Sequence, residues 1–171
     1  MASITVDPYN VNKPSNFVEE AGFYNVKIVD AHFKANSKGN DMITFDVSVL
    51  DGEYQGAVIK YNNMSWNEDD SDKKASSIKR FNSLAIALGA KKDATLTIEQ
   101  IATNMIDHNI NVYVDWEKPN NKGQSYLKTR SYFPVDEEGS KPNGKKNPTL
   151  NDPSLPDNGA PIDIKDDDLP F

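Results

Sequence analysis

The sequence predicts a mainly β protein that carries a helical insertion and ends in a disordered acidic tail. Five segments have the alternation or the β-branched and aromatic content of half-buried strands. The region between the third and fourth of these segments changes to helical spacing, and regular patterning stops after Val135. The length of 171 residues is that of one domain with an extension.

The first three expected strands follow one another closely. They cover residues 22–36, 41–52 and 57–66. In the second of them, Ile43, Phe45 and Val47 alternate with Thr44, Asp46 and Ser48, as in a strand that buries one face. The links between the strands consist of turn-forming residues, so we expect an antiparallel meander.

Helical spacing begins after the third strand. Within residues 67–90 the expected buried positions are Ile78, Phe81, Leu84, Ala85 and Leu88. Ser71 or Asp72 is the expected N-cap, and Gly89 ends the helix. A second short helix is expected at 97–107, with Ile98, Ile101 and Met105 as its buried stripe.

Two more strands are expected after the helices, at 109–119 and 124–135, joined by a hairpin loop. The resulting order is that of the five-stranded Greek-key barrel known as the OB-fold, with one or two helices between strands three and four. That fold binds oligonucleotides with its middle strands and hairpin loops. We therefore expect an N-terminal arm at 1–20 and an OB-like nucleic-acid-binding domain at 21–135.

Residues 136–171 are rich in Pro, Gly, Asn and charge, and Phe171 is their only aromatic residue. Such a segment cannot bury enough apolar surface to offset its ordering entropy, so we expect a disordered tail. Its r.m.s. reach is roughly 30 Å. The tail has nine acidic and four basic residues, so it carries −5 of the total charge of −7. The body is therefore close to neutral and has room for a basic face.

The composition also limits the class of protein. Without cysteine there are no disulfides and no thiolate metal sites. No apolar run approaches the ~20 residues that span a bilayer, and the N-terminus lacks the pattern of a signal peptide. We expect a cytoplasmic protein that does not act at a membrane.

The sequence shows no arrangement of residues that suggests catalysis. His32 and His108 are isolated from each other and are expected to be structural or exposed. The acidic run at 67–72 lacks the Gly and the late Glu of a calcium-binding loop, so we interpret it as a solvated loop before a helix. The sequence also has no phosphate-cradling glycine loop. We expect neither an enzyme nor a cofactor or metal site.

The fifth strand is the main candidate for a binding surface. Alternation places Tyr126, Lys128, Arg130 and Tyr132 on one face. Single-stranded nucleic acid binds such a surface, because phosphates attract cations and exposed bases stack on rings. Trp116 continues an apolar stripe and is expected in the core. The candidate binding residues are Lys34, Lys38, Lys60, Tyr61, Trp66, Lys118, Lys122, Tyr126, Lys128, Arg130 and Tyr132. The alternative is that these residues have no binding role, because strands favour aromatic residues and protein surfaces favour lysine.

The last residues form a second candidate site, suited to docking on a partner protein. The ring of Phe171 can enter an apolar pocket, and the nearby carboxylates can meet Arg or Lys around it. Pro170 restricts the backbone and lowers the ordering cost. The alternative is a solubilising end. The expected docking residues are Asp166, Asp167, Asp168, Leu169, Pro170 and Phe171.

The sequence DDDLPF closely resembles the C-terminal tip of bacterial and phage single-stranded DNA-binding proteins. The segments GFYNVKI, FDVSVLDGEYQG and KGQSYLKTRSYF resemble a group of phage proteins of the same role over roughly residues 20–135. The early N-x-V-x-L-x-G strand of the bacterial housekeeping protein does not occur. The resemblance implies a coat on single strands during phage DNA replication, recombination and repair in the host cytoplasm. Its tip would recruit proteins of these pathways. No family base-contact residue can be carried over by position.

Two other functions fit the same sequence. The near-neutral body is compatible with a protein-only adaptor, or with an acidic DNA mimic that inhibits a host enzyme. An OB-fold also serves RNA-binding proteins. The sequence does not determine the oligomeric state, and it is compatible with a homo-oligomer.

Overall fold

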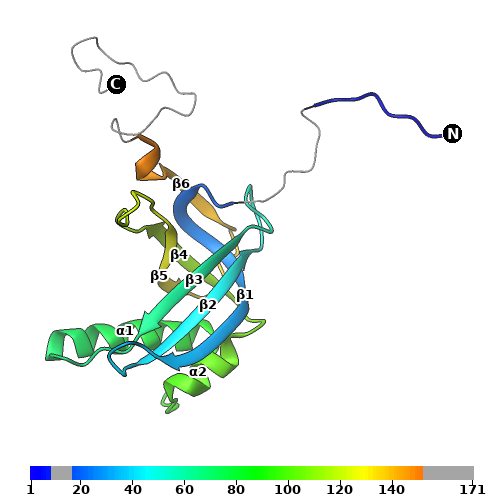
Figure 1. Cartoon of the computed structure of the whole chain (residues 1–171). Helices are drawn as coiled ribbons and strands as arrows, with labels where there is room; N and C mark the ends of the chain where they lie inside the picture. Colours follow the sequence, from blue (N-terminus) through cyan, green and yellow to red (C-terminus); the bar gives the residue numbers. More distant parts are fainter. Residues whose placement is uncertain (9–16, 152–171) are drawn as a thin grey trace, which may run out of the picture.

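The computed structural model describes residues 1–8 and 17–151 (Figure 1). Over these residues the protein is mainly β, with six antiparallel strands in an open sheet and two α-helices. The mainly β class and a helical insertion between the third and fourth strands are confirmed. The elements in order are β1 (Glu20–Ala35), β2 (Asp41–Val49), β3 (Val58–Ser65), α1 (Ser71–Ala87), α2 (Ile98–Met105), β4 (Asn109–Trp116), β5 (Leu127–Phe133), β6 (Lys141–Lys146) and the short 3-10 helix η1 (Pro148–Asn151).

The long strand β1 organises the sheet, in which the order is β3-β2-β1-β4-β5. Its residues 22–27 pair with β4, and its residues 26–35 pair with β2. The register with β2 shifts between Ile28 and Asp30, and such an irregularity lets a strand bend. One strand of 16 residues therefore joins the two halves of the sheet.

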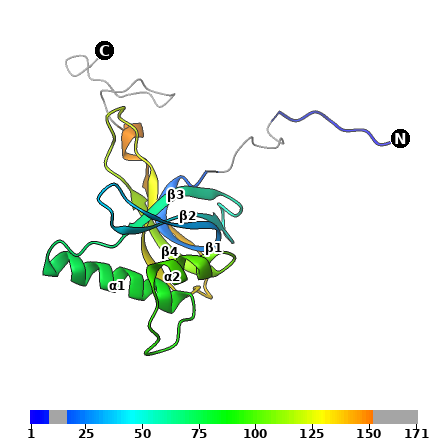
Figure 2. The same ribbon diagram turned by 60° about the horizontal axis from the view of Figure 1, so that its bottom comes forward.

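The core contains the alternating apolar residues that the strands present inward. Phe45 and Val47 of β2 are buried, as the alternation predicted, and so are Val112 and Val114 of β4. Figure 2 shows α1 and α2 next to each other at one end of the sheet. Within the described residues, no helix combines the length and the apolarity needed to cross a bilayer.

Helix α1 differs in detail from its prediction. Asp70 is the N-cap in place of Ser71 or Asp72, since its Oδ1 accepts a hydrogen bond of 2.8 Å from the Lys73 amide. Ile78 was expected in the buried stripe but is half exposed, whereas Ser77 is buried. The Ser77 hydroxyl bonds both the amide and the carbonyl of Asn67, and these bonds hold that face of the helix inward.

The largest correction concerns residues 136–151, which were expected to belong to the disordered tail. Here β6 pairs with β1 near Glu20 and Phe23. All six residues of β6 are exposed, so backbone pairing and not apolar burial defines this strand. Gly22 permits the approach: its φ is +144°, and a Cβ there would lie 2.6 Å from the Lys141 carbonyl oxygen. The rest of the tail, including the tip at 166–171, lies outside the described residues.

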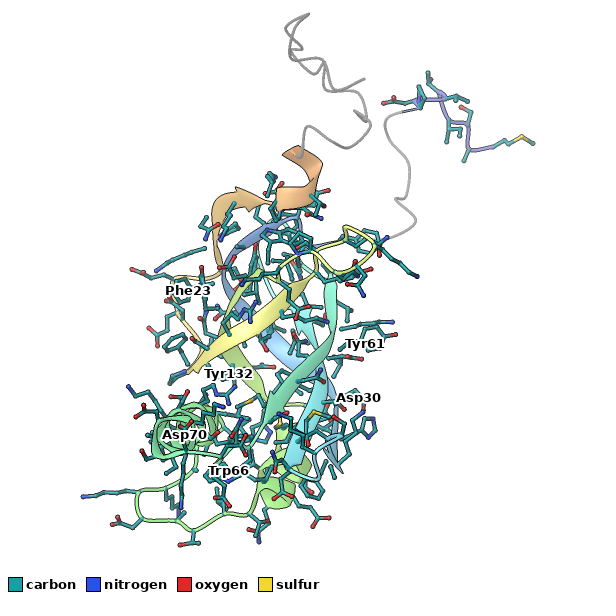
Figure 3. The ribbon with its side chains drawn as sticks, turned by 60° about the vertical axis from the view of Figure 1, so that its left-hand side comes forward. Phe23, Asp30, Tyr61, Trp66, Asp70 and Tyr132 are labelled. Carbon is teal, nitrogen blue, oxygen red and sulfur yellow. The ribbon has the colours of Figure 1, made fainter. Side chains whose placement is uncertain are left out.

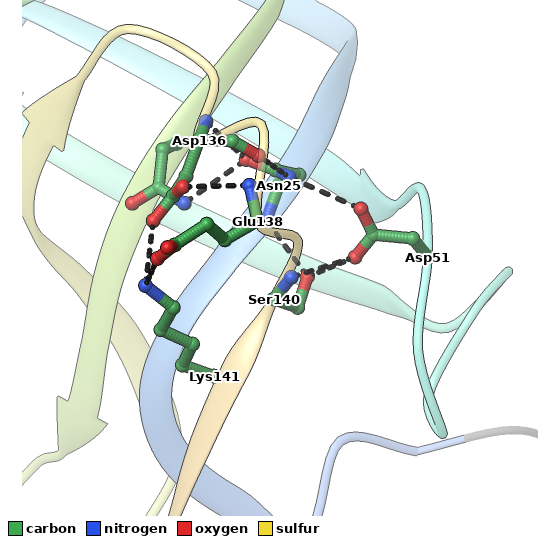
Figure 4. Close-up of polar contacts among 7 residues, drawn as sticks. Asn25, Asp51, Asp136, Glu138, Ser140 and Lys141 are labelled. Atoms are coloured by element: carbon green, nitrogen blue, oxygen red, sulfur yellow. Dashed lines mark hydrogen bonds and ion pairs between the residues drawn. The ribbon is translucent and has the colours of Figure 1, made fainter.

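A buried polar network fixes the chain between β5 and β6 (Figure 4). The side-chain amide of Asn25 donates through Nδ2 to Asp51 Oδ2 at 3.0 Å and to the Asp136 carbonyl at 2.7 Å. Its amide oxygen accepts from the Asp136 amide at 2.9 Å and from Asn111 Nδ2 at 3.0 Å. Ser140 donates from both its amide and its hydroxyl to Asp51 Oδ1. Asn25 thus joins β1, β4, the β2–β3 turn and the approach to β6.

Candidate nucleic-acid interface

A groove of about 910 Å³ lies between β3 and β5, which end the sheet order on opposite sides. Its lining combines apolar and aromatic side chains with two lysines. We call it the β3–β5 groove. The residues that matter most below are Phe17, Val58, Lys60, Tyr61, Trp116, Tyr126 and Lys128.

Side chains hold β3 and β5 together at this groove. Lys128 Nζ donates to the carbonyl oxygens of Lys60 and Tyr61, both at 3.0 Å. The Thr129 amide donates to Oδ1 of the buried Asn62 at 3.0 Å. These hydrogen bonds from Lys128 and Thr129 therefore fix the position of Lys60 and Tyr61 relative to β5.

The backbone at Tyr61 turns its ring outward. The register between β2 and β3 shifts here, and Tyr61 has a φ of +61°, which is uncommon for a residue with a large side chain. Its amide donates to Asp46 Oδ1 at 2.9 Å, which supports this conformation. The ring is 71% exposed, lies on the outer side of β3 (Figure 3), and has Lys128 Nζ 5.7 Å from its centroid.

The electrostatics of the groove centre on Lys128. Burial lowers the pKa of its ammonium group, while the negative charges of Glu117 and Asp46 act in the opposite direction and only partly offset it. Lys60 is exposed at the groove's edge. The groove therefore presents one ammonium group that is already hydrogen-bonded and a second one that faces solvent.

The prediction that Tyr132 lies on the binding face is wrong. Tyr113 of β4 is opposite Ser131 and Val114 is opposite Thr129, so Arg130 is an extra residue that forms a β-bulge. Every side chain after the bulge changes face. Tyr132 is 3% exposed and packs on Phe45. Burial raises its pKa to about 12, although the hydrogen bond with Thr129 opposes this.

The other predicted residues of β5 and its preceding loop lie at or beside the groove. Tyr126 is 50% exposed, lines the groove, and its hydroxyl donates to Gln124 Oε1 at 2.6 Å. Arg130 is exposed. Lys118 and Lys122 are exposed in the loop between β4 and β5.

Trp116 was expected in the core, and it packs against the core while one side lines the groove. Its indole nitrogen donates to the Lys145 carbonyl at 2.8 Å, which ties β4 to β6. Its main role is therefore packing, and it is also positioned to report on occupancy of the groove.

Lys34, Lys38 and Trp66 are not brought together with the groove. Gly22 of β1 pairs with Val114 of β4, which is opposite Thr129 of β5, next to the groove. Lys34 is twelve positions further along β1, so roughly 40 Å of strand separates it from Gly22. Trp66 lies at the same end as Lys34, because its amide donates to the Asp41 carbonyl at 2.8 Å. Its ring packs on Phe81 with centroids 5.9 Å apart, so Trp66 has a packing role.

Sequence reasoning missed two apolar residues of the groove, Phe17 and Val58. Phe17 is an isolated aromatic residue in the N-terminal arm, with no periodic pattern that assigns it to a surface. Val58 is exposed at the start of β3, although its residue type is typical of a core.

The isolated histidines do not form a site with each other. His32 is exposed, with its Nε2 3.0 Å from Asp30 Oδ2. The His108 carbonyl accepts a hydrogen bond of 2.9 Å from the Ile28 amide. In the part of the chain that the structure describes, no three His, Asp or Glu side chains are grouped so that they could hold a metal ion.

Fold and groove together define a mainly β protein with an aromatic and basic groove between β3 and β5, the two end strands of the sheet order. The chain belongs to the family described as "Protein of unknown function (DUF669)", which it matches over residues 4–142. The matched region includes β1 to β5 and reaches the beginning of β6. No curated protein matches the chain.

Proposed function

We propose that this protein binds single-stranded DNA without sequence preference, in the β3–β5 groove. The observation that carries the proposal is the grouping of two outward rings, Tyr61 and Tyr126, with Lys60 and Lys128 in one open groove. Base–aromatic stacking contributes ~1 to 3 kcal/mol per base, and cations attract the backbone. Stacking accepts any base, because every base has a π face.

The strand order supports an OB-type arrangement for this function. The order β3-β2-β1-β4-β5, with helices between β3 and β4, becomes a Greek-key barrel when β5 meets β3. The bonds from Lys128 and Thr129 to β3 lie at the place where such a barrel closes. On this view the bound strand lies over the closing seam.

Single strands suit the groove better than duplex. The bases of a duplex are stacked inside it, so the rings of Tyr61 and Tyr126 would have no base face to contact. Neither ring needs a base-specific hydrogen bond in order to stack, which fits a coat on transient single strands during phage replication, recombination and repair in the host cytoplasm.

The test is anisotropy titration of labelled oligothymidylate, duplex and oligouridylate with the full chain. We expect tight binding to oligothymidylate, weak binding to duplex, and a logarithmic salt slope near −0.7 per phosphate contact. Equal affinity for duplex and single strand would overturn the proposal. Preference for oligouridylate would indicate an RNA-binding module. No affinity for any of the three would favour a protein-only adaptor or a DNA mimic.

We propose a separate role for the C-terminal tip, Asp166 to Phe171, which lies outside the described residues. Its acids and apolar residues suit capture of replication or recombination proteins. Deleting Phe171 is expected to abolish capture of such partners by the immobilised protein and to leave oligothymidylate affinity equal or tighter. Weaker DNA binding in this variant would place the tip in the groove instead.

A further inference from the structure

The bulge at Arg130 changes which side chains of β5 face outward beyond the groove. Before the bulge, Tyr126 and Lys128 face outward, and after it Phe133 does so in place of Tyr132. The outer face of β5, together with Tyr126 just before it, therefore presents a ring at Tyr126, cations at Lys128 and Arg130, and a second ring at Phe133. It begins in the groove and leaves it at Arg130.

Phe133 belongs to a second group of rings, which we call the aromatic cluster: Phe23 of β1, Tyr113 of β4 and Phe133 of β5. The Phe23 ring lies 4.9 Å from that of Tyr113 and 5.9 Å from that of Phe133, centroid to centroid. Phe23 is 41% and Phe133 42% exposed. In Figure 3, Phe23 and Tyr61 lie on opposite sides of β5, so this strand connects the two surfaces.

Sheet stability explains only part of this cluster. Phe23 and Tyr113 are directly opposite each other in the β1–β4 ladder, where such pairs stabilise a sheet. Phe133 is opposite Asn111 instead, so its ring joins the cluster from a neighbouring position. Exposed apolar side chains that gather in one patch are typical of interaction surfaces.

The surroundings of the cluster favour an anionic ligand with flat rings. Arg130 lies between the groove and the cluster; the residue is exposed, and its Nη2 donates to the Trp116 carbonyl at 3.4 Å. Lys141 is opposite Phe23 in β6, and Lys145 contacts Asp115. Both lysines are already in ion pairs, Lys145 with Asp115 and Lys141 with Asp136 and Glu138, so a phosphate at this face would rely on Arg130.

We propose that a single strand bound in the β3–β5 groove continues along the outer face of β5 and stacks further bases on the aromatic cluster. Groove and cluster then form one extended site, with Arg130 as the phosphate contact between them. This inference rests on the proposed function. It differs from that function in predicting that affinity depends on the cluster only for strands long enough to pass Arg130.

The test compares Phe133→Leu with Phe133→Tyr in the full chain, using oligothymidylates of about 4 and about 20 nucleotides, which span the site sizes of OB-folds. Leu keeps apolar bulk but has no π face, whereas Tyr keeps the ring. We expect Phe133→Leu to weaken binding of the longer oligomer by about 5- to 150-fold, the loss of one stacked base. Binding of the shorter oligomer is expected to be unchanged, and Phe133→Tyr is expected to match the wild type.

Further outcomes separate this inference from the proposed function. If the wild type binds neither oligomer, both fail. If the wild type binds and Phe133→Leu has wild-type affinity at both lengths, only the extended site is overturned. A changed mass of Phe133→Leu in light scattering would overturn it too, because the cluster would then be an interface between copies. Phe23→Leu repeats the test on another strand, and circular dichroism checks that each variant is folded.

Discussion

Replacing both Tyr61 and Tyr126 with Ala is expected to weaken binding of oligothymidylate by about 30-fold or more. Each ring stacks one base in the proposed complex, and loss of each costs ~1 to 3 kcal/mol. The rings are 71% and 50% exposed, so their removal changes the core little. The change should therefore appear in DNA affinity, measured by anisotropy, and hardly in the thermal midpoint.

The matched control is the double variant with Phe at both positions, which keeps the rings and removes the hydroxyls. We expect it to bind nearly as the wild type does, because the Tyr126 hydroxyl contacts only Gln124 among the described residues. Phe33→Ala removes another exposed ring, near the far end of β1, and should also leave affinity unchanged. Wild-type affinity in the Ala double variant would remove both rings from the site.

Asn25→Ala is expected to cause the largest loss of stability, about 3 kcal/mol or more, since buried groups left without a partner cost ~1 to 3 kcal/mol each. The Asn25 side chain is buried, and it bonds Asp51, Asn111 and both backbone groups of Asp136. A chain of this length should lose about 6 to 12 °C in thermal midpoint. Urea unfolding measures the free energy, and Asn63→Ala, at an exposed position of β3, is the control.

The same variant should also be more sensitive to acid. Burial alone raises the pKa of Asp51, but the hydrogen bonds from Ser140 and Asn25 outweigh it and hold the pKa below its usual value. A carboxyl with a lowered folded-state pKa stabilises the fold above its unfolded pKa of about 4, and this contribution is lost as pH falls through the folded-state pKa. Removing the Asn25 donor raises that pKa, so acid unfolding should begin at a higher pH. An acid midpoint identical to the wild type would contradict the role given to Asn25.

The sequence predicted those parts of the fold that rest on periodic side chains. Phe45 and Val47 alternate with polar neighbours, so the inner face of β2 could be read directly. Strand β6 could not be, because its exposed residues carry no alternation and its pairing with β1 depends on the backbone of Gly22.

The candidate site was predictable in kind but not in every residue. The aromatic and basic pattern of β5 was visible in the sequence. Whether Tyr132 or Phe133 faces outward depends on the bulge at Arg130, which no residue type predicts. Lys34 and Lys38 looked equivalent to Lys60 as surface cations. Only the length of β1 and its pairing with β2 and β4 place them at the opposite end of the sheet.

Hydrogen exchange, followed by mass spectrometry with and without saturating oligothymidylate, tests the groove most directly. We predict slower exchange of the amides in residues 58–61 and 125–130 when the oligomer is bound, with little change in α1 and α2. Protection confined to the helices or to the β1–β2 loop, or the absence of protection at both groove segments, would contradict the account.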